Sequence, residues 1–242
     1  MRKLLLILTV IAVATSSCRF GWGKRVRGNG NVKTEEHTVS GFKNVLLSGG
    51  MNVYLIQGDA KPVKIEADEN LLQYIEVEQQ GDDLVIRSRE GFNLQASSGD
   101  IKIYVTNPVY NRIQLSGAGN IIGQSQIVSS ENMDVQVSGA GDVKVDLKAP
   151  AVKVNLPGAG SIEIKGETKD LDLHLTGVGS AHCFGLMSEN AKVHVTGVGS
   201  AEVYASVSID AHVSGVGDIK YKGGASNVSQ QVSGVGSVKK VD

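Results

Sequence analysis

Apolar residues alternate with polar ones along most of the chain, and in its second half this alternation repeats with a fixed period. Successive copies of one heptapeptide start 22, 19, 19, 20, 18 and 19 residues apart. Alternation predicts strands with one buried face. A regular period of this length predicts a solenoid whose coils stack on each other. The seven copies begin at Leu115, Val137, Leu156, Leu175, Val195, Val213 and Val232.

Aligning the copies on their first glycine sorts the residues into columns. The columns two and four residues before that glycine are almost wholly apolar, and we expect them to form the core wall. Five residues before it, the charge alternates in sign from copy to copy. Parallel stacking at about 4.8 Å would place opposite charges side by side, each pair contributing roughly 0.2–1 kcal/mol. This column contains Arg112, Asp134, Lys153, Asp172, Lys192 and Asp210, followed by Ser229.

The motif Gly-Ala-Gly or Gly-Val-Gly, followed by Asn, Asp or Ser, predicts a tight corner between two strands of each coil. Glycine adopts positive φ at little cost, and Asn, Asp and Ser bond the nearby backbone. Helical periodicity is nearly absent, the best short candidate being residues 69–74. We therefore expect an all-β protein with a parallel β-helix, right-handed because parallel crossovers almost always are.

The chain divides into two parts that we expect to form one continuous domain. Residues 111–242 carry the repeats, whereas 31–110 keep the strand alternation without the glycine corner, and 47–53 look like a degenerate eighth copy. We expect 31–110 to be a β-rich N-terminal cap that closes the first end of the solenoid. A bare end would expose unpaired backbone groups.

The first 17 residues have the layout of a lipoprotein signal peptide. Arg2 and Lys3 precede an apolar stretch that is too short to span a bilayer as a helix, and small residues follow. Cys18 is the expected lipid attachment site; the alternative is ordinary cleavage near Ser17 with Cys18 free. Residues 18–30 are expected to be a tether, either basic to suit lipid headgroups or carrying incidental charge.

Charge and cysteine content narrow the classes of partner. Of the 24 Lys and Arg residues, two lie in the signal peptide, which leaves 22 against 25 Asp and Glu. This weakly acidic balance excludes a nucleic-acid partner, which requires a basic face. Cys183 falls in an apolar column and is expected to be a buried small hydrophobe. With Cys18 acylated, no disulfide forms within the chain.

Three histidines, His174, His194 and His212, share one column three residues before the glycine. Because Gln and Asn fill the rest of the column, a structural stack is the favoured interpretation. The alternative is a candidate binding face, in which neighbouring rings contact a ligand. No metal site is predicted, because a straight ladder offers zinc a poor tetrahedron.

Parallel β-helices include polysaccharide-cleaving enzymes, so paired carboxylates are relevant. Asp142 and Asp218 share a column but lie four coils apart, about 19 Å, whereas glycosidase pairs lie roughly 5–10 Å apart. Glu66, Asp68 and Glu69 follow a predicted turn and are expected to be solvated. The corner motif carries too few Asp residues for a calcium repeat and lacks a phosphate-loop Lys. We therefore predict no catalytic residues and no cofactor.

Residues 28–36, the phrase 39–45 and the later glycine corners together resemble the DUF2807 family, common in Bacteroidetes, whose description names an auto-transporter adhesin with a head GIN domain. The resemblance covers about residues 28–240. It implies a right-handed β-helix in a secreted or anchored protein, and it carries no catalytic residues onto this chain.

These observations favour a lipid-anchored β-solenoid that acts as a binding or adhesion module of the cell envelope. Its expected partners are the membrane, through the anchor, and a glycan or other surface ligand, since seven coils give a rod section of roughly 30 Å. Tyr104, Tyr110, Tyr204 and Tyr221 form no column, which weakens the glycan hypothesis. The alternatives are a polysaccharide-active β-helix enzyme and a periplasmic structural protein without a dedicated ligand. We expect export across the inner membrane and anchoring at the outer membrane, on its periplasmic face or the cell surface.

Overall fold

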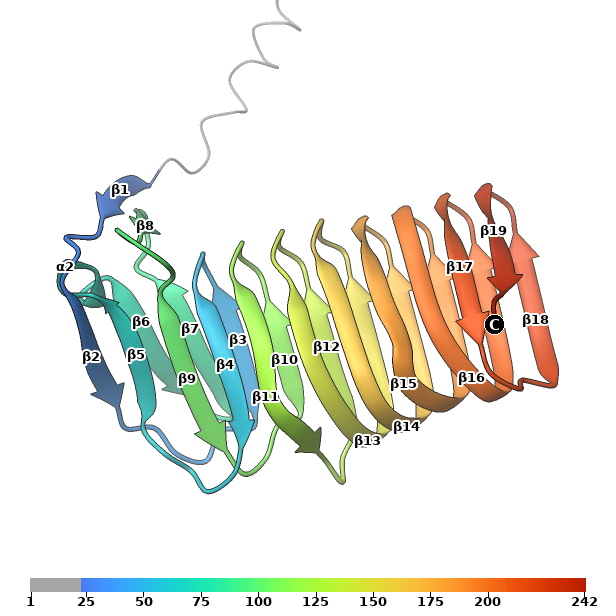
Figure 1. Ribbon diagram of the computed structural model, residues 1–242, viewed down its shortest axis with the longest axis horizontal. Helices are drawn as coiled ribbons and strands as arrows, with labels where there is room; N and C mark the ends of the chain where they lie inside the picture. Colours follow the sequence, from blue (N-terminus) through green and yellow to red (C-terminus); the bar gives the residue numbers. More distant parts are fainter. Residues whose placement is uncertain (1–22) are drawn as a thin grey trace, which may run out of the picture.

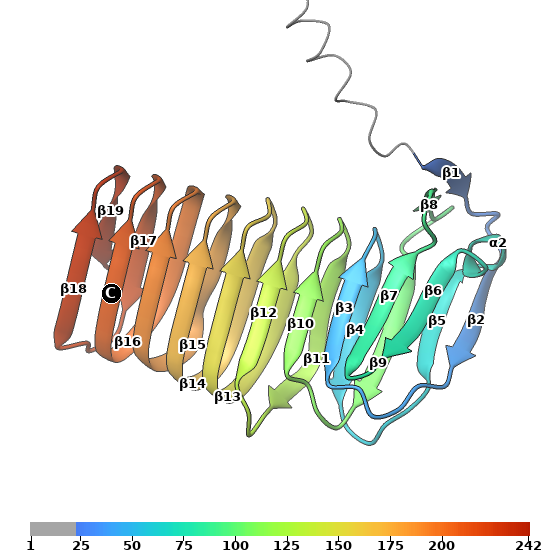
Figure 2. The ribbon, with the colours of Figure 1, turned by 180° about the vertical axis from the view of Figure 1, so that it is seen from behind.

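Two walls of strands form a right-handed solenoid, and the strands of its repeats stack in parallel (Figures 1 and 2). A computed structural model describes residues 23–242, so the predicted signal peptide and Cys18 lie outside the described residues. No helix in residues 23–242 is long and apolar enough to cross a membrane. The repeats form β10 (Arg112–Leu115), β11 (Asn120–Val128), β12 (Met133–Val137), β13 (Val143–Leu156), β14 (Ser161–Leu175), β15 (Val178–Val195), β16 (Val198–Val213), β17 (Val216–Lys222), β18 (Asn227–Val232) and β19 (Val235–Lys240).

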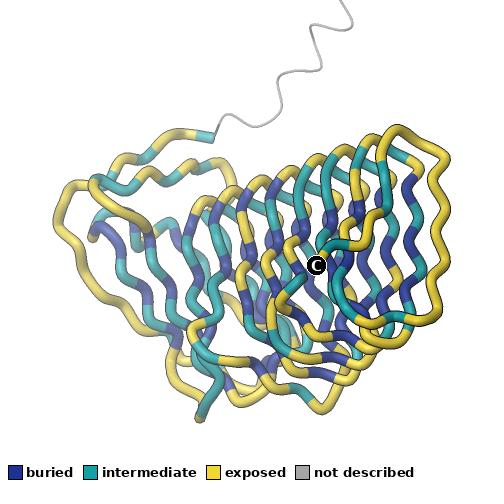
Figure 3. Tube along the Cα trace, turned by 45° about the vertical axis from the view of Figure 1, so that its right-hand side comes forward, coloured by how far each residue is buried: buried dark blue, intermediate teal, exposed yellow. Residues whose placement is uncertain are grey.

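The strands stack in the register that the repeats predict. In the column four residues before the glycine, Ile113 pairs with Val135, Val135 with Val154 and Val154 with Leu173. All of these side chains are buried, and buried and exposed residues alternate along each coil (Figure 3). The degenerate eighth copy is also confirmed, because Leu115 pairs with Leu47 and Asn120 with Asn52. The expected parallel β-helix is therefore confirmed.

The corners are built differently from the prediction. Positive φ was the expected reason for glycine, yet most corner glycines, Gly199 among them, have no positive φ. They are needed because successive corners approach closely. A Cβ on Gly199 would lie 1.8 Å from the carbonyl oxygen of Gly179, and one on Gly139 would lie 1.8 Å from that of Gly117. Only glycine lets the corner backbones stack at this spacing.

Antiparallel strands close the first end of the solenoid. β2 pairs with β5, β5 with β9 and β6 with β7 in antiparallel fashion, whereas β3 and β4 continue the parallel coils. Strand pairing thus continues from the predicted cap, residues 31–110, into the predicted repeats, residues 111–242. The bounds are β2 (Val32–His37), β3 (Asn44–Ser48), β4 (Asn52–Gln57), β5 (Val63–Asp68), α2 (Glu69–Leu72), β6 (Ile75–Gln80), β7 (Asp83–Ser88) and β9 (Lys102–Asn107).

Part of the segment expected to be a tether is ordered. β1 (Lys24–Arg27) pairs in parallel with β8 (Phe92–Gln95) in a separate two-stranded sheet. The two strands come from distant parts of the sequence and carry no repeat, so periodicity gave no signal for this pairing. The chain therefore enters the described structure against the first end of the solenoid (Figure 1).

The expectation that Asp68 is solvated is wrong. Asp68 is only 2% exposed and accepts hydrogen bonds from the Gly30 N–H at 2.6 Å, the Ser97 N–H at 3.0 Å and the Ser97 hydroxyl at 2.5 Å. These bonds, led by that of the Ser97 hydroxyl, lower the pKa of the carboxyl group. Asp68 is therefore a structural clamp that holds β5 to the loops around Gly30 and Ser97.

The last coil is uncovered. All six residues of β18 are exposed, and Val228 and Val232 keep 44% and 45% of their surface accessible. Lys240 in β19 follows the buried Tyr221 in register and is itself exposed. A charged side chain at an otherwise apolar position of an edge strand hinders pairing with another chain. The last coil thus has unpaired edge strands, and Lys240 hinders their pairing with another chain.

Candidate binding site

The three predicted histidines lie in one stack on the outer surface. His174 pairs in register with His194, and His194 with His212. Their ring centroids are 5.0 and 4.9 Å apart, with interplanar angles of 14° and 26°. Stacked rings of this kind present faces to each other instead of converging nitrogens. Within residues 23–242, no group of three His, Cys, Asp or Glu side chains is arranged to hold a metal ion.

Acidic neighbours bind the two outer histidines. Nε2 of His174 lies 3.0 Å from Oδ1 of Asp172, and Nε2 of His212 lies 2.8 Å from Oδ1 of Asp210. The pKa of His194 is lowered, first by burial and then by His174, His212 and Lys192. The column is thus a stacked polar ladder in which His212 and Asp210 share a hydrogen bond, whereas Oδ1 of Asp172 is buried without a hydrogen-bond partner.

The charged column has the predicted register but few close ion pairs. Arg112 lies 3.4 Å from Asp134, and the next residues in register are Lys153, Asp172 and Lys192. Among the ion pairs of residues 23–242, this is the only one between two members of the column, since Asp172 and Asp210 bind histidines instead. Its other members remain exposed enough to be solvated, so its contribution to stability is small.

The corner aspartates are structural acceptors. The Ser161 hydroxyl donates to Asp142 at 2.9 Å, and the Ser237 hydroxyl donates to Asp218 at 2.5 Å. The bond from Ser237 is the main cause of the lowered pKa of Asp218. Each carboxylate thus ties one corner to the next. This arrangement accounts for both residues without a catalytic role.

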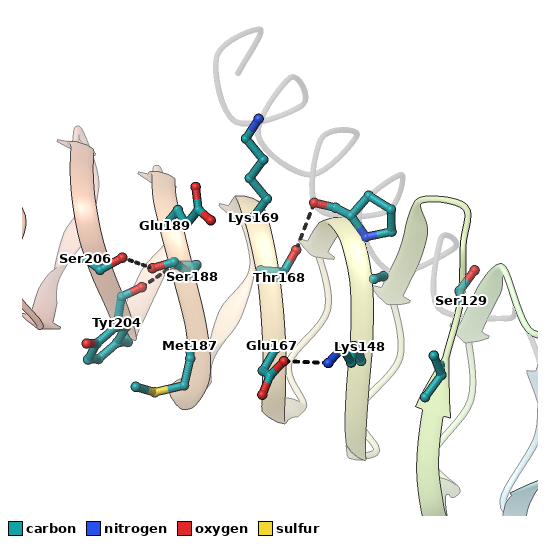
Figure 4. A pocket seen from close by; sticks show the side chains of 13 residues that line it. Ser129, Lys148, Glu167, Thr168, Lys169, Met187, Ser188, Glu189, Tyr204 and Ser206 are labelled. Carbon is teal, nitrogen blue, oxygen red and sulfur yellow. Dashed lines mark hydrogen bonds and ion pairs between the residues drawn. The ribbon is translucent and has the colours of Figure 1, made fainter.

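A groove crosses the coils on the side opposite the glycine corners, at the bend where each long strand passes from one wall to the other (Figure 4). Its volume is about 620 Å³, and it extends from the end of β11 across β13, β14 and β15 to β16. A further hollow of about 540 Å³ continues on the adjoining wall along the same coils. The groove is lined by Val128, Ser129, Lys148, Ala149, Pro150, Glu167, Thr168, Lys169, Met187, Ser188, Glu189, Tyr204 and Ser206.

The groove combines an apolar surface with a polar border. Met187 is 47% exposed and Val128 is 49% exposed, both large values for apolar side chains, and Tyr204 lies beside Met187 (Figure 4). Lys148 and Glu167 form an ion pair at 2.9 Å on one side. Concave, mainly apolar surfaces with a few polar groups are typical of ligand sites.

Internal hydrogen bonds hold the floor of the groove in place. The Thr168 hydroxyl donates to the Pro150 carbonyl at 3.3 Å, and the Ser206 hydroxyl donates to the Ser188 carbonyl at 3.3 Å. The Ser188 hydroxyl donates to the Tyr204 carbonyl. These bonds link neighbouring coils at the bend, so the fold itself positions the floor of the groove.

Sequence reasoning missed the groove because its residues carry no repeated motif. A register shift between Cys183 and Met187 brings Met187 opposite Tyr204 in the next coil. Cys183 itself is fully buried, as predicted, and burial raises the pKa of its thiol to about 12. Tyr104, which forms no column with Tyr110, Tyr204 or Tyr221, stacks on Tyr54 with ring centroids 5.1 Å apart. In the sequence, the one sign of this register shift is that residues 184–187 break the alternation of apolar and polar positions.

Comparison with known proteins gives a consistent result. The DUF2807 family, described as "Putative auto-transporter adhesin, head GIN domain", matches residues 41–225. A crystal structure of a "putative adhesin" from Bacteroides fragilis NCTC 9343 has a TM-score of 0.84 and 27% identity, covering 89% of this chain and 100% of that one. A "putative adhesin" from Parabacteroides distasonis ATCC 8503 has a TM-score of 0.70 and 27% identity, covering 90% and 100%.

A third structure supports the fold alone. It is a "Putative lipid binding protein" from Parabacteroides distasonis ATCC 8503, with 24% identity, a TM-score of 0.75 and coverage of 90% and 100%. None of the curated proteins compared with this chain matches it. Since the family match spans residues 41–225, more than half of the chain, the chain belongs to the DUF2807 family of adhesin-like proteins.

Proposed function

We propose that the protein is a lipid-anchored binding module of the cell envelope, acylated at Cys18, which holds a glycan chain in the groove at the bend of its coils. The observation that carries this proposal is the exposed Met187 beside the half-buried Tyr204 on a mainly apolar surface. The adhesin-like family and the signal-peptide layout support an envelope location.

The geometry of the groove favours a long, repetitive ligand. From β13 to β16 it crosses three coil spacings, about 14 Å at strand spacing, and it is open along its length. The ion pair of Lys148 with Glu167 leaves the border without a strong net charge of one sign. Hydroxyl groups such as that of Ser206 can both donate and accept hydrogen bonds. A neutral polysaccharide suits these features better than a highly charged one.

A variant of Tyr204 tests this proposal. Replacing Tyr204 by Ala is expected to weaken binding of a neutral polysaccharide at least tenfold, about 1.4 kcal/mol, because it removes the aromatic contact surface. The matched control is Tyr54→Ala, which removes an outward tyrosine from the stack with Tyr104, away from the groove. Affinity for a panel of soluble neutral and uronic-acid polysaccharides would be measured by calorimetry, with assay of released reducing ends.

The same assay separates the alternatives. Saturable binding without release of reducing ends supports a binding module. Release of reducing ends from uronic-acid polymers would favour the polysaccharide-active enzyme. Failure to bind any member of the panel, in a protein with an intact fold, would favour the periplasmic structural protein without a dedicated ligand.

A further inference from the structure

Four valines form an exposed line along the glycine corners. Each is the central residue of a Gly-Val-Gly motif. Their exposed fractions are 61% for Val178, 50% for Val198, 52% for Val216 and 72% for Val235. Val178 pairs with Val198, Val198 with Val216 and Val216 with Val235, so the line is continuous. We call it the valine ridge.

The ridge is apolar along its whole length, although polar side chains at an exposed corner would remain solvated at no cost in free energy. In the earlier coils the same position holds Ala118, Ala140 and Ala159, all exposed. The neighbouring columns are mostly small and hydroxylic, including Thr176, Thr196, Ser180 and Ser200. Asp142 and Asp218 are the charged members of these columns, and both are exposed. A narrow apolar edge flanked mainly by hydroxyl groups can enter the headgroup region of a bilayer while these two carboxylates stay at its polar surface.

The chain enters the structure on the same edge. Gly23, the first described residue, and Ala118, the first residue of the apolar line, border one hollow beside Gly49 and Gly50. β1 lies at the level of the corners in both views (Figures 1 and 2). Its Lys24, Arg25 and Arg27 are all exposed. Basic residues at this place complement the negative surface of anionic lipids.

The covalent distance to the anchor is short. Gly23 follows Cys18 by five positions, and an extended chain spans at most about 18 Å over that interval. An acyl chain on Cys18 would therefore hold β1 within reach of the headgroups. The edge of the solenoid nearest to β1 is the edge of glycine corners.

We propose that the valine ridge is a lipid-contacting edge, so that the solenoid lies along the membrane with its glycine corners toward the lipid and its groove toward the opposite side. The proposal rests on the proposed acylation of Cys18 and goes beyond it, because an anchor alone does not set the orientation. Lipid contact along one edge would leave the bend of the coils, where Met187 and Tyr204 lie, open to a ligand.

A pair of labelled positions in one strand tests the orientation. β16 contains Val198 on the ridge and Val207 at the opposite bend, where it is 45% exposed. The acylated full-length chain carrying Val198→Cys or Val207→Cys would be labelled with an environment-sensitive fluorophore. Cys183 does not compete for the label, because it is fully buried and its thiol pKa is raised to about 12.

The labelled proteins would be reconstituted into vesicles of phosphatidylethanolamine and phosphatidylglycerol that contain a lipid-attached quencher. We expect quenching at position 198 to exceed that at 207 at least threefold, and Val178→Asp with Val216→Asp to remove the difference. Equal quenching at the two positions in chains that float with the vesicles would overturn the ridge proposal and leave the anchor standing. Absence of both flotation and a lipid on Cys18 by mass spectrometry would overturn the anchor and the ridge together.

Discussion

Replacing Gly199 by Ala is expected to destabilise the solenoid by at least about 3 kcal/mol, the upper part of the range for overpacked sites. The added Cβ would lie 1.8 Å from the Gly179 carbonyl oxygen, and backbone atoms cannot move aside as a flexible side chain would. The next coil also stacks closely, since a Cβ on Gly217 would lie 2.0 Å from the Gly199 oxygen. Urea denaturation followed by circular dichroism would measure the change in the free energy of unfolding.

Gly50→Ala is the matched control. Gly50 occupies the ridge column in the degenerate eighth coil, where a Cβ would have nothing within 4 Å and φ is not positive. We expect this change to be neutral or to stabilise by about 0.4–1 kcal/mol through the unfolded chain. Equal stability of Gly199→Ala and the wild type would contradict the close stacking of the corners.

Replacing Asp68 by Ala is expected to destabilise the capped end by about 3 kcal/mol. The change leaves the Gly30 N–H, the Ser97 N–H and the Ser97 hydroxyl without their acceptor, and bonds to a charged group contribute roughly 1.5–3 kcal/mol. The control is Asp59→Ala, at an exposed turn, which should stay within about 0.5 kcal/mol of the wild type. The same denaturation measurement applies, and equal effects of the two variants would rule out the clamp.

The effect of Asp68 should also depend on pH. Because its folded pKa is lowered, the stability it contributes is present above its unfolded pKa of about 3.9 and is lost as the pH falls through the folded value. The difference in unfolding free energy between the wild type and Asp68→Asn should therefore be constant from pH 7 to 5 and shrink below pH 4. A difference that does not change down to pH 2 would show that the carboxylate charge plays no part.

The architecture was predictable because every coil has the same pattern of apolar and polar positions around its glycine corner. Leu115 and Val137 lie two residues before a corner glycine and face the same core, so one period places every coil. The histidine column followed from the same alignment. The physical reason for the glycines did not, because the sequence records the residue type and not the distance between neighbouring backbones.

The groove and the clamp were not predictable for a different reason. Met187 faces Tyr204 only because β15 carries extra residues that shift its register, and a shift breaks the period on which the alignment depends. Asp68 is buried by loops around Gly30 and Ser97 that are far from it in sequence and follow no repeat. Segments that are not part of the repeat can contact each other over long sequence distances, and such contacts leave no pattern in a single sequence.

Hydroxyl-radical footprinting of the full-length chain, with and without the neutral polysaccharide that binds most tightly, tests the central claim most directly. Met187 and Tyr204 carry reactive side chains in the groove, and His174, His194 and His212 report on a different surface of the same coils. The account predicts that the ligand lowers oxidation of Met187 and Tyr204 several-fold and leaves the histidines unchanged. Protection of the histidines with Met187 still fully oxidised would contradict it and place the ligand on the histidine column.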